Sequence, residues 1–379
     1  MKKVDGNNRK LSVTLVIAHL GLGGAERVLA HMADYWAQNG RRVTLMTLDH
    51  GNDPPFYALG PSVARVDFGW SRVWRAGIPK LRMPCALLAL RSALHRTRPD
   101  IIISFLNTTN VSVLMASYGL GVPVIVSERN DPRHDTVSTY WERRRRWLYR
   151  SADALVVQTQ AALDYFAPPV RRRGCVIPNP VRLPEGVRGG ALKNMPCRTR
   201  REIVAVGRLV EQKGFDLLLS AFSLVAAANP AWSLTIWGEG AERPGLEAMV
   251  HRLGLGERVR FPGTTRDIFE QLPEADLFVL SSRYEGFPNA LCEAMACGLP
   301  VVSFDCPSGP REIIRDGIDG ILVPPENPRA LADAMQRLME DEDLRLRLAG
   351  SAARIVERFS PERIFGMWED LLLKCVNGR

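Results

Sequence analysis

The chain has 379 residues, 46% of them hydrophobic and 24% charged, which is enough to bury a large core and favours two domains over one. Seven scattered cysteines without a Cys-x-x-Cys pair argue against a zinc site or a disulfide framework and favour the reducing cytoplasm. The net charge of +9 is uneven, because residues 1–184 hold 26 Lys/Arg against 13 Asp/Glu and residues 185–379 hold 24 against 28. Such a basic half suits a polyanion, which charge alone leaves open among nucleic acid, an anionic membrane and a phosphorylated acceptor.

The first half predicts a parallel sheet covered by helices. An apolar strand at 11–20 leads through a glycine-rich turn into a helix over about 25–39. Further strands are expected at 42–48, 100–105, 123–128, 154–159 and 174–179, with helical lengths of chain between them. This alternation predicts a doubly wound, Rossmann-like domain over residues 1–184. The first apolar run is too short for a membrane span.

The second half repeats the same alternation after a change in composition. Residues 185–200 are rich in Gly, Pro and basic residues and predict an inter-domain linker. Strands are then expected at 203–208, 233–240, 258–263, 277–282, 300–304 and 320–324, which gives a second Rossmann-like domain over 201–360. Residues 361–379 carry an apolar stripe at helical spacing and are expected to pack back toward the N-terminal domain. The carboxyl ends of two such sheets are expected to face a cleft, where open α/β sheets bind ligands.

The segment SSRYEGFPNALCEAMACGLP places two glutamates around the start of a helix. Glu285 lies in the loop, Pro288 suits the first helical turn, and Glu293 lies inside the helix. The backbone N–H groups at a helix start form a site for an anion such as a diphosphate. Glu285 can then hold the hydroxyls of a sugar and Glu293 those of a ribose, although the spacing taken alone favours chance and a solvated helix face.

The segment VGRLVEQKG places two cations after the first strand of the second half. Arg208 stands at the strand end, and Lys213 stands just before a helix. Arginine engages phosphate oxygens bidentately and lysine acts as a point charge, so the two can neutralise a diphosphate leaving group. A solvated surface group is the alternative for each residue taken singly.

These motifs together resemble the donor domain of glycosyltransferase family 4, a family of retaining enzymes with the GT-B fold. The stretches that carry the resemblance are GRLVEQKGFDLLLSAF, LTIWGEG, VRFPGTTRDIFEQLPEADLFVLSSRYEGFPNALCEAMACGLPVV and GPREIIRDGIDGILVPP. With GLGGAERV and VIPNPV in the first half, the resemblance spans nearly the whole chain. The resemblance implies an α/β fold of GT-B type, with two doubly wound Rossmann-like domains facing a cleft.

The resemblance also implies roles for individual residues. Arg208, Lys213 and Glu285 are implied as catalytic residues that bind the diphosphate and the donor sugar. The implied donor-binding residues are Gly23, Gly24, Asn179, Gly207, Arg266, Gly286, Phe287, Pro288, Asn289, Ala290, Leu291 and Glu293. An Asn-Pro turn is an equally good structural account of Asn179. The resemblance implies no metal requirement and no cofactor besides the nucleotide-sugar donor.

One departure from the family concerns the acceptor side. Many relatives carry a histidine after the fourth strand of the first domain, where this chain reads SERNDP. Together with SFLNTTN, this segment resembles a subgroup that builds bacterial surface polysaccharides and lipid-linked oligosaccharides. The acceptor candidates are Asn107, Thr108, Glu128, Arg129 and Asn130. A buried strand-end ion pair is an equal alternative at 128–129, and His19 and His134 are possible replacements for the histidine.

The sequence thus predicts a retaining glycosyltransferase that moves a hexose or N-acetylhexosamine from a UDP-sugar to a polyprenyl-diphosphate-linked glycan. GDP-mannose is the alternative donor, and a basic nucleic-acid-binding protein is the alternative of another class, although no recognition motif occurs. A dinucleotide-dependent oxidoreductase is disfavoured because GLGGAE lacks the Gly-x-Gly-x-x-Gly spacing. A UDP-sugar 2-epimerase shares the architecture, but its expected motifs are absent.

The basic and aromatic residues of the first half bear on location. The segment at 68–96 mixes tryptophans with basic residues, and in the segment at 140–150 two tryptophans bracket four arginines. Basic and aromatic residues together suit an anionic lipid interface. We therefore expect a cytoplasmic protein that binds peripherally to the inner face of the cytoplasmic membrane. An ordinary solvated helix is the alternative.

Overall fold

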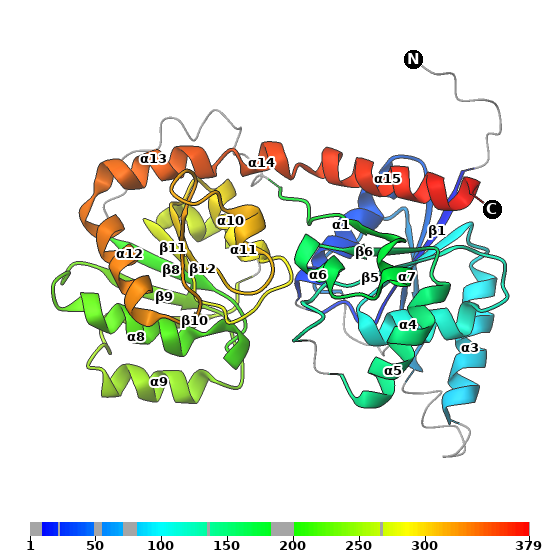
Figure 1. Ribbon diagram of the computed structural model, residues 1–379, viewed down its shortest axis with the longest axis horizontal. Coiled ribbons are helices and arrows are strands. Elements are labelled where there is room, and N and C mark those ends of the chain that lie inside the picture. Colours follow the sequence, from blue (N-terminus) through cyan, green and yellow to red (C-terminus); the bar gives the residue numbers. More distant parts are fainter. Residues whose placement is uncertain are drawn as a thin grey trace. The chain divides into compact units, whose positions relative to one another are not determined.

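A computed structural model describes residues 10–21, 23–48, 55–70, 82–134, 137–182, 201–265 and 268–378 of the chain. The chain divides into two compact units (Figure 1). Unit 1 comprises Met1–Ile177 and Ile364–Arg379, and unit 2 comprises Pro178–Arg363. The linker expected at 185–200 lies outside the described residues.

Unit 1 is built on a seven-stranded parallel sheet in the order β3-β2-β1-β4-β5-β6-β7. Its strands are β1 (Ser12–Ile17), β2 (Arg42–Thr47), β3 (Val63–Asp67), β4 (Ile101–Phe105), β5 (Val124–Ser127), β6 (Ala154–Val157) and β7 (Gly174–Val176). The inner strands β1, β4, β5 and β6 are buried at every residue, because helices cover both faces of the sheet. The doubly wound sheet predicted from the sequence is therefore confirmed. The edge strand β3 was not predicted, since its half-exposed residues do not form an apolar run.

The helices of unit 1 follow the strands along the chain. They are α1 (Gly24–Gln38), α3 (Arg82–Arg96), α4 (Asn107–Ser117), α5 (Thr139–Leu148), α6 (Gln160–Asp164) and α7 (Pro168–Arg171). The last helix, α15 (Pro361–Asn377), enters unit 1 from unit 2 and packs its Trp368 edge-on against Trp36 of α1, with ring centroids 6.5 Å apart. An ion pair of 2.8 Å between Arg41 and Glu369 adds to this contact. The C-terminal helix is thus integrated into the core of unit 1.

Unit 2 is built on a six-stranded parallel sheet in the order β10-β9-β8-β11-β12-β13. Its strands are β8 (Glu202–Val206), β9 (Ser233–Trp237), β10 (Val259–Gly263), β11 (Leu277–Leu280), β12 (Val301–Phe304) and β13 (Ile321–Val323). Its helices are α8 (Phe215–Ala226), α9 (Arg243–Arg252), α10 (Asn289–Ala296), α11 (Pro310–Ile313), α12 (Pro328–Glu340), α13 (Glu342–Ala352) and α14 (Ile355–Arg358). This second parallel α/β unit also agrees with the predicted fold class.

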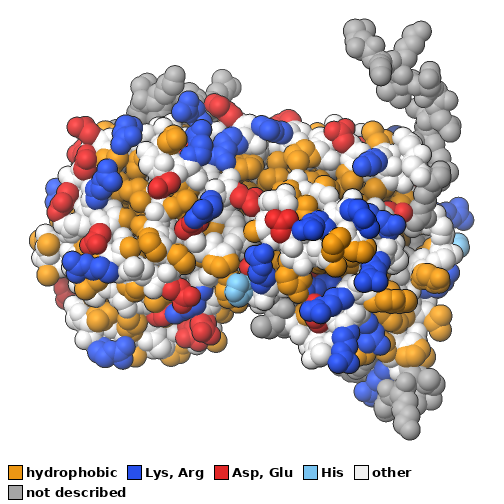
Figure 2. Space-filling view, viewed as in Figure 1, with side chains coloured by type: hydrophobic (Ala, Val, Ile, Leu, Met, Phe, Trp, Pro, Cys, Tyr) orange, Lys and Arg blue, Asp and Glu red, His pale blue; other side chains and the backbone are white. Residues whose placement is uncertain are grey.

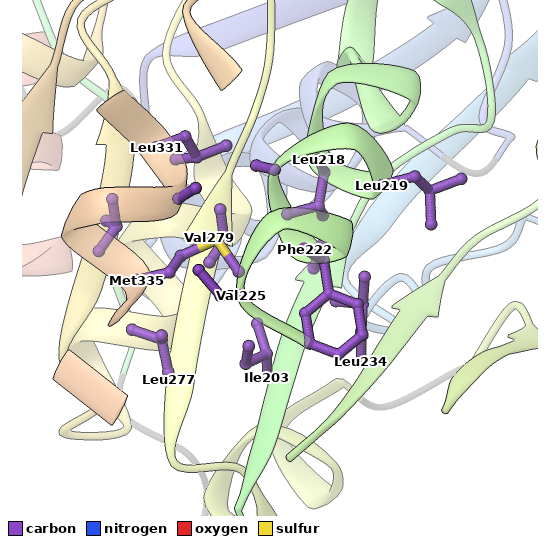
Figure 3. Packing of buried hydrophobic residues seen from close by; sticks show 14 of the residues in the cluster. Ile203, Leu218, Leu219, Phe222, Val225, Leu234, Leu277, Val279, Leu331 and Met335 are labelled. Atoms are coloured by element: carbon purple, nitrogen blue, oxygen red, sulfur yellow. The ribbon is translucent and has the colours of Figure 1, made fainter. Parts of the chain in front are cut away.

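One apolar cluster holds the sheet of unit 2 to its helices. Phe222 of α8 lies over Ile203 of β8 and Leu234 of β9, and all three side chains are fully buried (Figure 3). Met335 belongs to the same cluster and adds α12 beside α8. Each fully buried side chain of this size contributes roughly 1.5–3 kcal/mol relative to an exposed one. The cluster therefore provides a rigid base for the loops that leave the carboxyl ends of β8, β9, β11 and β12.

Candidate active site

The loops after β8 and β11 bring Lys213 and Glu285 into direct contact. Lys213 lies in a short 3-10 turn, Glu211–Lys213, and its Nζ is 2.6 Å from Oε1 of Glu285. The hydroxyl of Ser282 donates a second hydrogen bond of 2.7 Å to the same carboxylate oxygen. The two charged side chains retain 18% and 7% exposure, so Lys213 is partly exposed to solvent whereas Glu285 is buried beside it. Lys213 and Glu285, predicted from separate motifs, are thus one structural feature.

Glycines allow these loops to approach each other closely. Gly214 follows Lys213 with a φ of +62°, and a Cβ atom there would lie 2.1 Å from the carbonyl oxygen of Ser281. Gly238, after β9, has a φ of +148°, and its Cβ atom would lie 1.8 Å from the carbonyl oxygen of Gly207. Gly207 in turn lies against the side chain of Lys213. Because no other residue fits these positions without moving backbone, the glycines fix the path on which Lys213 meets Glu285.

Arg283 ties the loop after β11 to the start of α8. Its guanidinium donates hydrogen bonds of 2.9 and 2.7 Å to the two carboxylate oxygens of Asp216, and a third of 2.8 Å to the carbonyl oxygen of Glu211. Burial works to raise the pKa of Asp216, but the hydrogen bonds and charge of Arg283 hold that pKa below its usual value. Gln212 adds a hydrogen bond of 3.0 Å to the carbonyl oxygen of Tyr284. The sequence-based reasoning missed Ser282 and Arg283, although both lie beside Glu285 in the same segment.

The start of α10 forms the next part of the site. Its first turn has no acidic residue, and Pro288 at the N-cap has no capping side-chain hydrogen bond. Asn179 donates a hydrogen bond of 2.6 Å from its side chain to the side-chain oxygen of Asn289. Gly309, with a φ of +100°, packs against Pro288. The structure therefore brings three of the sequence-predicted donor residues, Asn179, Pro288 and Asn289, to one helix N-terminus in unit 2.

The other donor candidates of unit 2 take different positions. Glu293 lies in the second turn of α10 and is buried. Gly286 and Phe287 continue the loop from Glu285, and Ala290 and Leu291 belong to the first turn of α10. Arg208 follows β8 and is exposed, with no ion pair to a described residue. Arg266 lies outside the described residues.

The glycine-rich turn of unit 1 holds a buried carboxylate that the sequence did not single out. Gly23 is the N-cap of α1, and a Cβ atom added to it would lie 2.1 Å from a carboxylate oxygen of Glu26. Glu26 is buried, and its Oε1 is 3.3 Å from Nδ1 of His19. The small residue at 23 therefore makes room for Glu26 at the start of α1, which Gly24 begins.

The acceptor candidates gather at the carboxyl ends of β4 and β5. Asn107 and Thr108 open α4, and residues 128–130 follow β5. The guanidinium of Arg129 lies 4.6 Å from the ring centroid of Phe105, and burial lowers the pKa of Arg129 to about 9. Asn130 is exposed. A few residues on, His134 contacts the buried Asp131 at 2.8 Å. Asn107, Glu128 and Arg129 thus belong to the packed interior, whereas Thr108 and Asn130 are exposed at the same strand ends.

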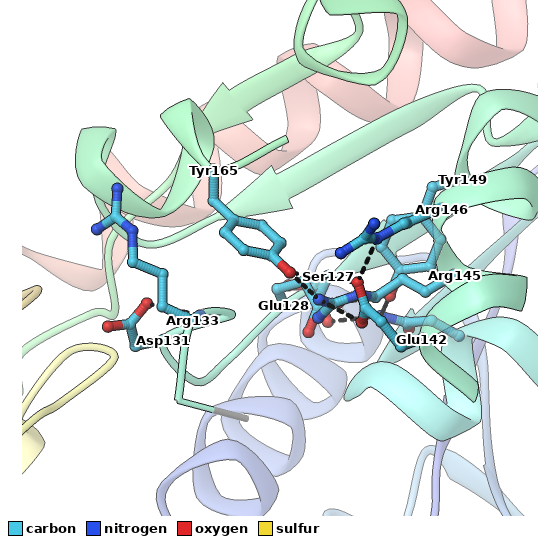
Figure 4. Close-up of polar contacts among 10 residues, drawn as sticks. Ser127, Glu128, Asp131, Arg133, Glu142, Arg145, Arg146, Tyr149 and Tyr165 are labelled. Carbon is cyan, nitrogen blue, oxygen red and sulfur yellow. Dashed lines mark hydrogen bonds and ion pairs between the residues drawn. The ribbon is translucent and has the colours of Figure 1, made fainter. Parts of the chain in front are cut away.

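Glu128 belongs to a buried polar network rather than to the surface (Figure 4). The hydroxyl of Tyr149 donates a hydrogen bond of 2.6 Å to its Oε1, and Nη1 of Arg145 lies 3.6 Å from the same oxygen. Both partners of this ion pair are 2% exposed. Burial works to lower the pKa of Arg145, but Glu128 together with Tyr149, Glu142 and Tyr165 outweighs burial and raises that pKa. For Glu128, the structure contains the strand-end ion pair that the sequence had left open as an alternative.

Among the described residues, no group of three or more His, Cys, Asp and Glu side chains is arranged to hold a metal ion. No helix in the described part of the chain is long and apolar enough to cross a membrane.

Known protein families match both halves of the chain. A family described as "Glycosyl transferase 4-like domain" matches residues 23–180, and one described as "Glycosyl transferases group 1" matches residues 200–341. The chain belongs to the group 1, family-4-like glycosyltransferases. The resemblance predicted from its motifs is thereby confirmed. The first match ends and the second begins on either side of the linker expected at 185–200.

Two curated relatives illustrate the range of the family. The chain is 34% identical over 292 residues to an exopolysaccharide phosphotransferase from Streptomyces coelicolor, of which it spans only 28%. It is 26% identical over 373 residues to an α-1,4-N-acetyl-D-galactosaminyltransferase from Campylobacter jejuni, named for an undecaprenyl-diphosphate-linked substrate. That match covers 97% of this chain and 99% of the relative.

Solved structures agree on the fold. A sucrose-phosphate synthase from Thermosynechococcus elongatus superposes with a TM-score of 0.80 at 21% identity, covering 98% of this chain and all of the other. An Anabaena protein in complex with UDP gives a TM-score of 0.76 at 20% identity, covering 96% and 99%. At such identities the likeness concerns the fold alone, and it confirms the predicted GT-B architecture.

Proposed function

We propose that this glycosyltransferase moves a hexose or N-acetylhexosamine from a UDP-sugar to a polyprenyl-diphosphate-linked glycan, with retention of the anomeric configuration. The observation that carries the proposal is the contact of 2.6 Å between Lys213 and Glu285, three residues before the N-cap of α10. Charged and hydrogen-bonding groups for a sugar and for a diphosphate thus lie within one loop system of unit 2.

The reaction requires stabilisation of a departing diphosphate. When the anomeric C–O bond breaks, negative charge grows on the leaving group while positive charge develops on the sugar. Lys213, the exposed Arg208 and the backbone N–H groups at the start of α10 supply fixed positive potential for the first of these charges. Glu285 accepts hydrogen bonds from sugar hydroxyls on the other side of Lys213. In this proposal the protein side chains provide the charge stabilisation without a bound metal.

The names of relatives support the proposed donor and acceptor. The Campylobacter relative transfers N-acetylgalactosamine according to its name, and the Anabaena structure contains UDP, which together favour a UDP-linked hexose or N-acetylhexosamine. The same relative's name includes an undecaprenyl diphosphate, which favours a lipid-linked acceptor in surface polysaccharide or oligosaccharide assembly. A GDP-mannose donor is the alternative. The acceptor is placed at the strand ends of unit 1, where the candidates of β4 and β5 gather.

Peripheral membrane contact is the second part of the proposal. On α5, Arg143, Arg146 and Trp147 are exposed, and Trp147 retains 71% of its surface. Figure 2 shows basic and hydrophobic side chains interspersed over the region of α3 to α5. Such a surface suits an anionic bilayer, because arginine meets the phosphates and tryptophan the interface. Sedimentation with anionic liposomes at low and moderate salt tests this part, and failure at both salt concentrations would overturn it.

A nucleotide-release screen tests the transfer reaction. Purified protein is assayed with UDP- and GDP-sugars, each with and without lipid-diphosphate acceptors that carry a short glycan. We expect acceptor-dependent release of UDP from one UDP-hexose or UDP-N-acetylhexosamine, and a product that retains the anomeric configuration in NMR spectra. Release of GDP alone would favour the mannosyl alternative, and an inverted product would contradict the proposed stereochemistry.

A further inference from the structure

Helix α5 presents two different faces in unit 1. Its four consecutive arginines, residues 143–146, look equivalent in sequence, yet Arg145 is 1% exposed whereas Arg143 and Arg146 are exposed. Leu148 and Tyr149, three and four residues after Arg145, are also buried, as helical spacing requires for one inward face. Arg145 therefore points into unit 1, whereas Arg143 and Arg146 face solvent.

Arg145 is held from both sides by side chains of neighbouring elements. Its Nη2 lies 2.7 Å from Oε2 of Glu142, one turn earlier, and donates a hydrogen bond of 2.9 Å to the hydroxyl of Tyr165. The guanidinium also lies 5.2 Å from the ring centroid of Tyr165. Its other nitrogen, Nη1, reaches Glu128 at 3.6 Å. Arg145 thus bridges α5 to the residue that directly follows β5 (Figure 4).

Tyr149 also contacts the residue that follows β5. Its hydroxyl donates to Glu128 and accepts a hydrogen bond of 2.9 Å from the side-chain amide of Asn110 in α4. The same amide nitrogen donates a hydrogen bond of 3.0 Å to the carbonyl oxygen of Ser127. Both the last residue of β5 and the residue after it are therefore fixed by side chains from α4 and α5. We call Glu128, Arg145, Tyr149 and Asn110 the strand-end clamp.

Two acceptor candidates directly follow the strand-end clamp along the chain. Arg129 begins immediately after the clamped residue, and its guanidinium donates a hydrogen bond of 3.4 Å to the hydroxyl of Ser127. Asn130 follows and is exposed. Buried charged networks contribute little stability compared with apolar packing of the same volume, so their use here points to placement of the backbone. The segment they place is the one that carries the acceptor candidates.

We propose that Arg145 and Tyr149 are positioning residues for acceptor use, which act by holding Glu128 and so fixing Arg129 and Asn130 at the carboxyl end of β5. This inference rests on the proposed function, because it takes that strand end as the acceptor side. Glu128 itself is an anchor in this arrangement, since its Oε1 accepts the hydrogen bond of Tyr149 and forms an ion pair with Arg145.

The test compares two clamp variants with a control arginine elsewhere in unit 1. Tyr149→Phe removes one hydroxyl and leaves the ring, and Arg145→Lys keeps the charge but loses the planar guanidinium. Arg171→Met is the control, because Arg171 of α7 also pairs with a carboxylate, Asp164 at 3.6 Å, yet its side chain is 44% exposed. Each variant is assayed with the donor found in the screen and a short-chain lipid-diphosphate acceptor, and amide hydrogen exchange of residues 127–131 is measured in parallel.

The expected result separates acceptor use from donor use. Hydrogen bonds to charged groups contribute enough for about a tenfold change, so Tyr149→Phe should raise the acceptor KM about tenfold. Its donor KM and its slow donor hydrolysis without acceptor should stay at the wild-type values. Amide exchange at 128–130 should become faster in Tyr149→Phe and Arg145→Lys, and Arg171→Met should match the wild type in every measurement.

Three results would overturn the inference, and a fourth would overturn the proposed function as well. An unchanged acceptor KM in Tyr149→Phe, or an equal loss in donor hydrolysis and acceptor transfer, would show that the clamp has only a structural role. Unchanged amide exchange at 128–130 would show that the clamp does not hold this segment. A wild-type protein that releases no nucleotide from any donor would overturn the proposed function and the acceptor assignment together.

Discussion

Two ion pairs at strand ends, one in each unit, differ in how they meet solvent. Arg145 and Glu128 in unit 1 are both 2% exposed and are surrounded by further hydrogen-bonding side chains. Lys213 and Glu285 in unit 2 retain 18% and 7% exposure, and their loops are shaped by glycines and fixed by Arg283. An ion pair that is closed to solvent, a sealed pair, has a structural role. An ion pair that solvent reaches can exchange one of its contacts for a contact to a ligand. We therefore propose that the pair in unit 2 contacts the donor.

Breaking the sealed pair should have the largest effect. Arg145→Met leaves the buried carboxylate of Glu128 without its cation, and such a loss destabilises proteins by about 3–5 kcal/mol. Thermal or urea unfolding measures it. The exposed neighbour offers a control, because Arg146→Met should change stability by less than about 1 kcal/mol. Equal losses from the two substitutions would contradict the division of α5 into two faces.

Breaking the pair of Lys213 and Glu285, which we call the open pair, should affect the reaction more than the fold. Lys213→Met and Glu285→Gln should each lower the rate of nucleotide release by roughly 100-fold or more, because each removes a preorganised charged contact to the reacting donor. Steady-state assays with the screened donor measure this loss. Arg329→Met is the matched control in unit 2, since Arg329 forms an exposed ion pair with Asp333 on α12. A variant at 213 or 285 that keeps a third of the rate would refute the assignment.

The glycines around the open pair allow a smaller, structural test. Gly238→Ala should destabilise the protein by about 1–3 kcal/mol, because its φ of +148° and the nearby carbonyl oxygen of Gly207 exclude a Cβ atom. Gly350→Ala on α13 meets no atom within 4 Å and should stabilise by about 0.5–1 kcal/mol, as alanine favours a helix. The unfolding midpoints of both variants measure these changes in stability. Opposite signs support the tight crossing of loops, and a tolerated Gly238→Ala would contradict it.

Removal of divalent metals should have the smallest effect. In the proposed mechanism Arg208, Lys213 and the start of α10 provide the positive potential for the diphosphate. EDTA should therefore leave the rate of nucleotide release unchanged. A strict requirement for added manganese would contradict the idea that the side chains of unit 2 suffice.

The sequence predicted the buried parts of the fold better than the edges. Continuous apolar runs identified β4, β5 and β6, because a strand buried on both faces leaves that pattern. The edge strand β3 was not predicted, because none of its residues is buried and its sequence does not form a continuous apolar run. The parallel order of each sheet also followed from the alternation of strands and helices.

The candidate site was predictable where its residues share a motif. Glu285 and Pro288 lie in one segment and Lys213 in another, and the family resemblance linked them. Their contact, and the part of Ser282 in it, depend on the crossing of two loops that no local pattern describes. Arg145 could not be distinguished within a run of four arginines, because its burial depends on the orientation of α5. Glu26, too, became visible only through its packing against Gly23.

Calorimetric titration of UDP into three proteins tests the central claim most directly: wild type, Lys213→Met and Tyr149→Phe. If the open pair of unit 2 holds the donor diphosphate, Lys213→Met should weaken UDP binding at least about tenfold, as expected for a lost charge-assisted contact. Tyr149→Phe should bind UDP as the wild type does. Equal UDP affinity in wild type and Lys213→Met, or a loss of affinity confined to Tyr149→Phe, would contradict the account.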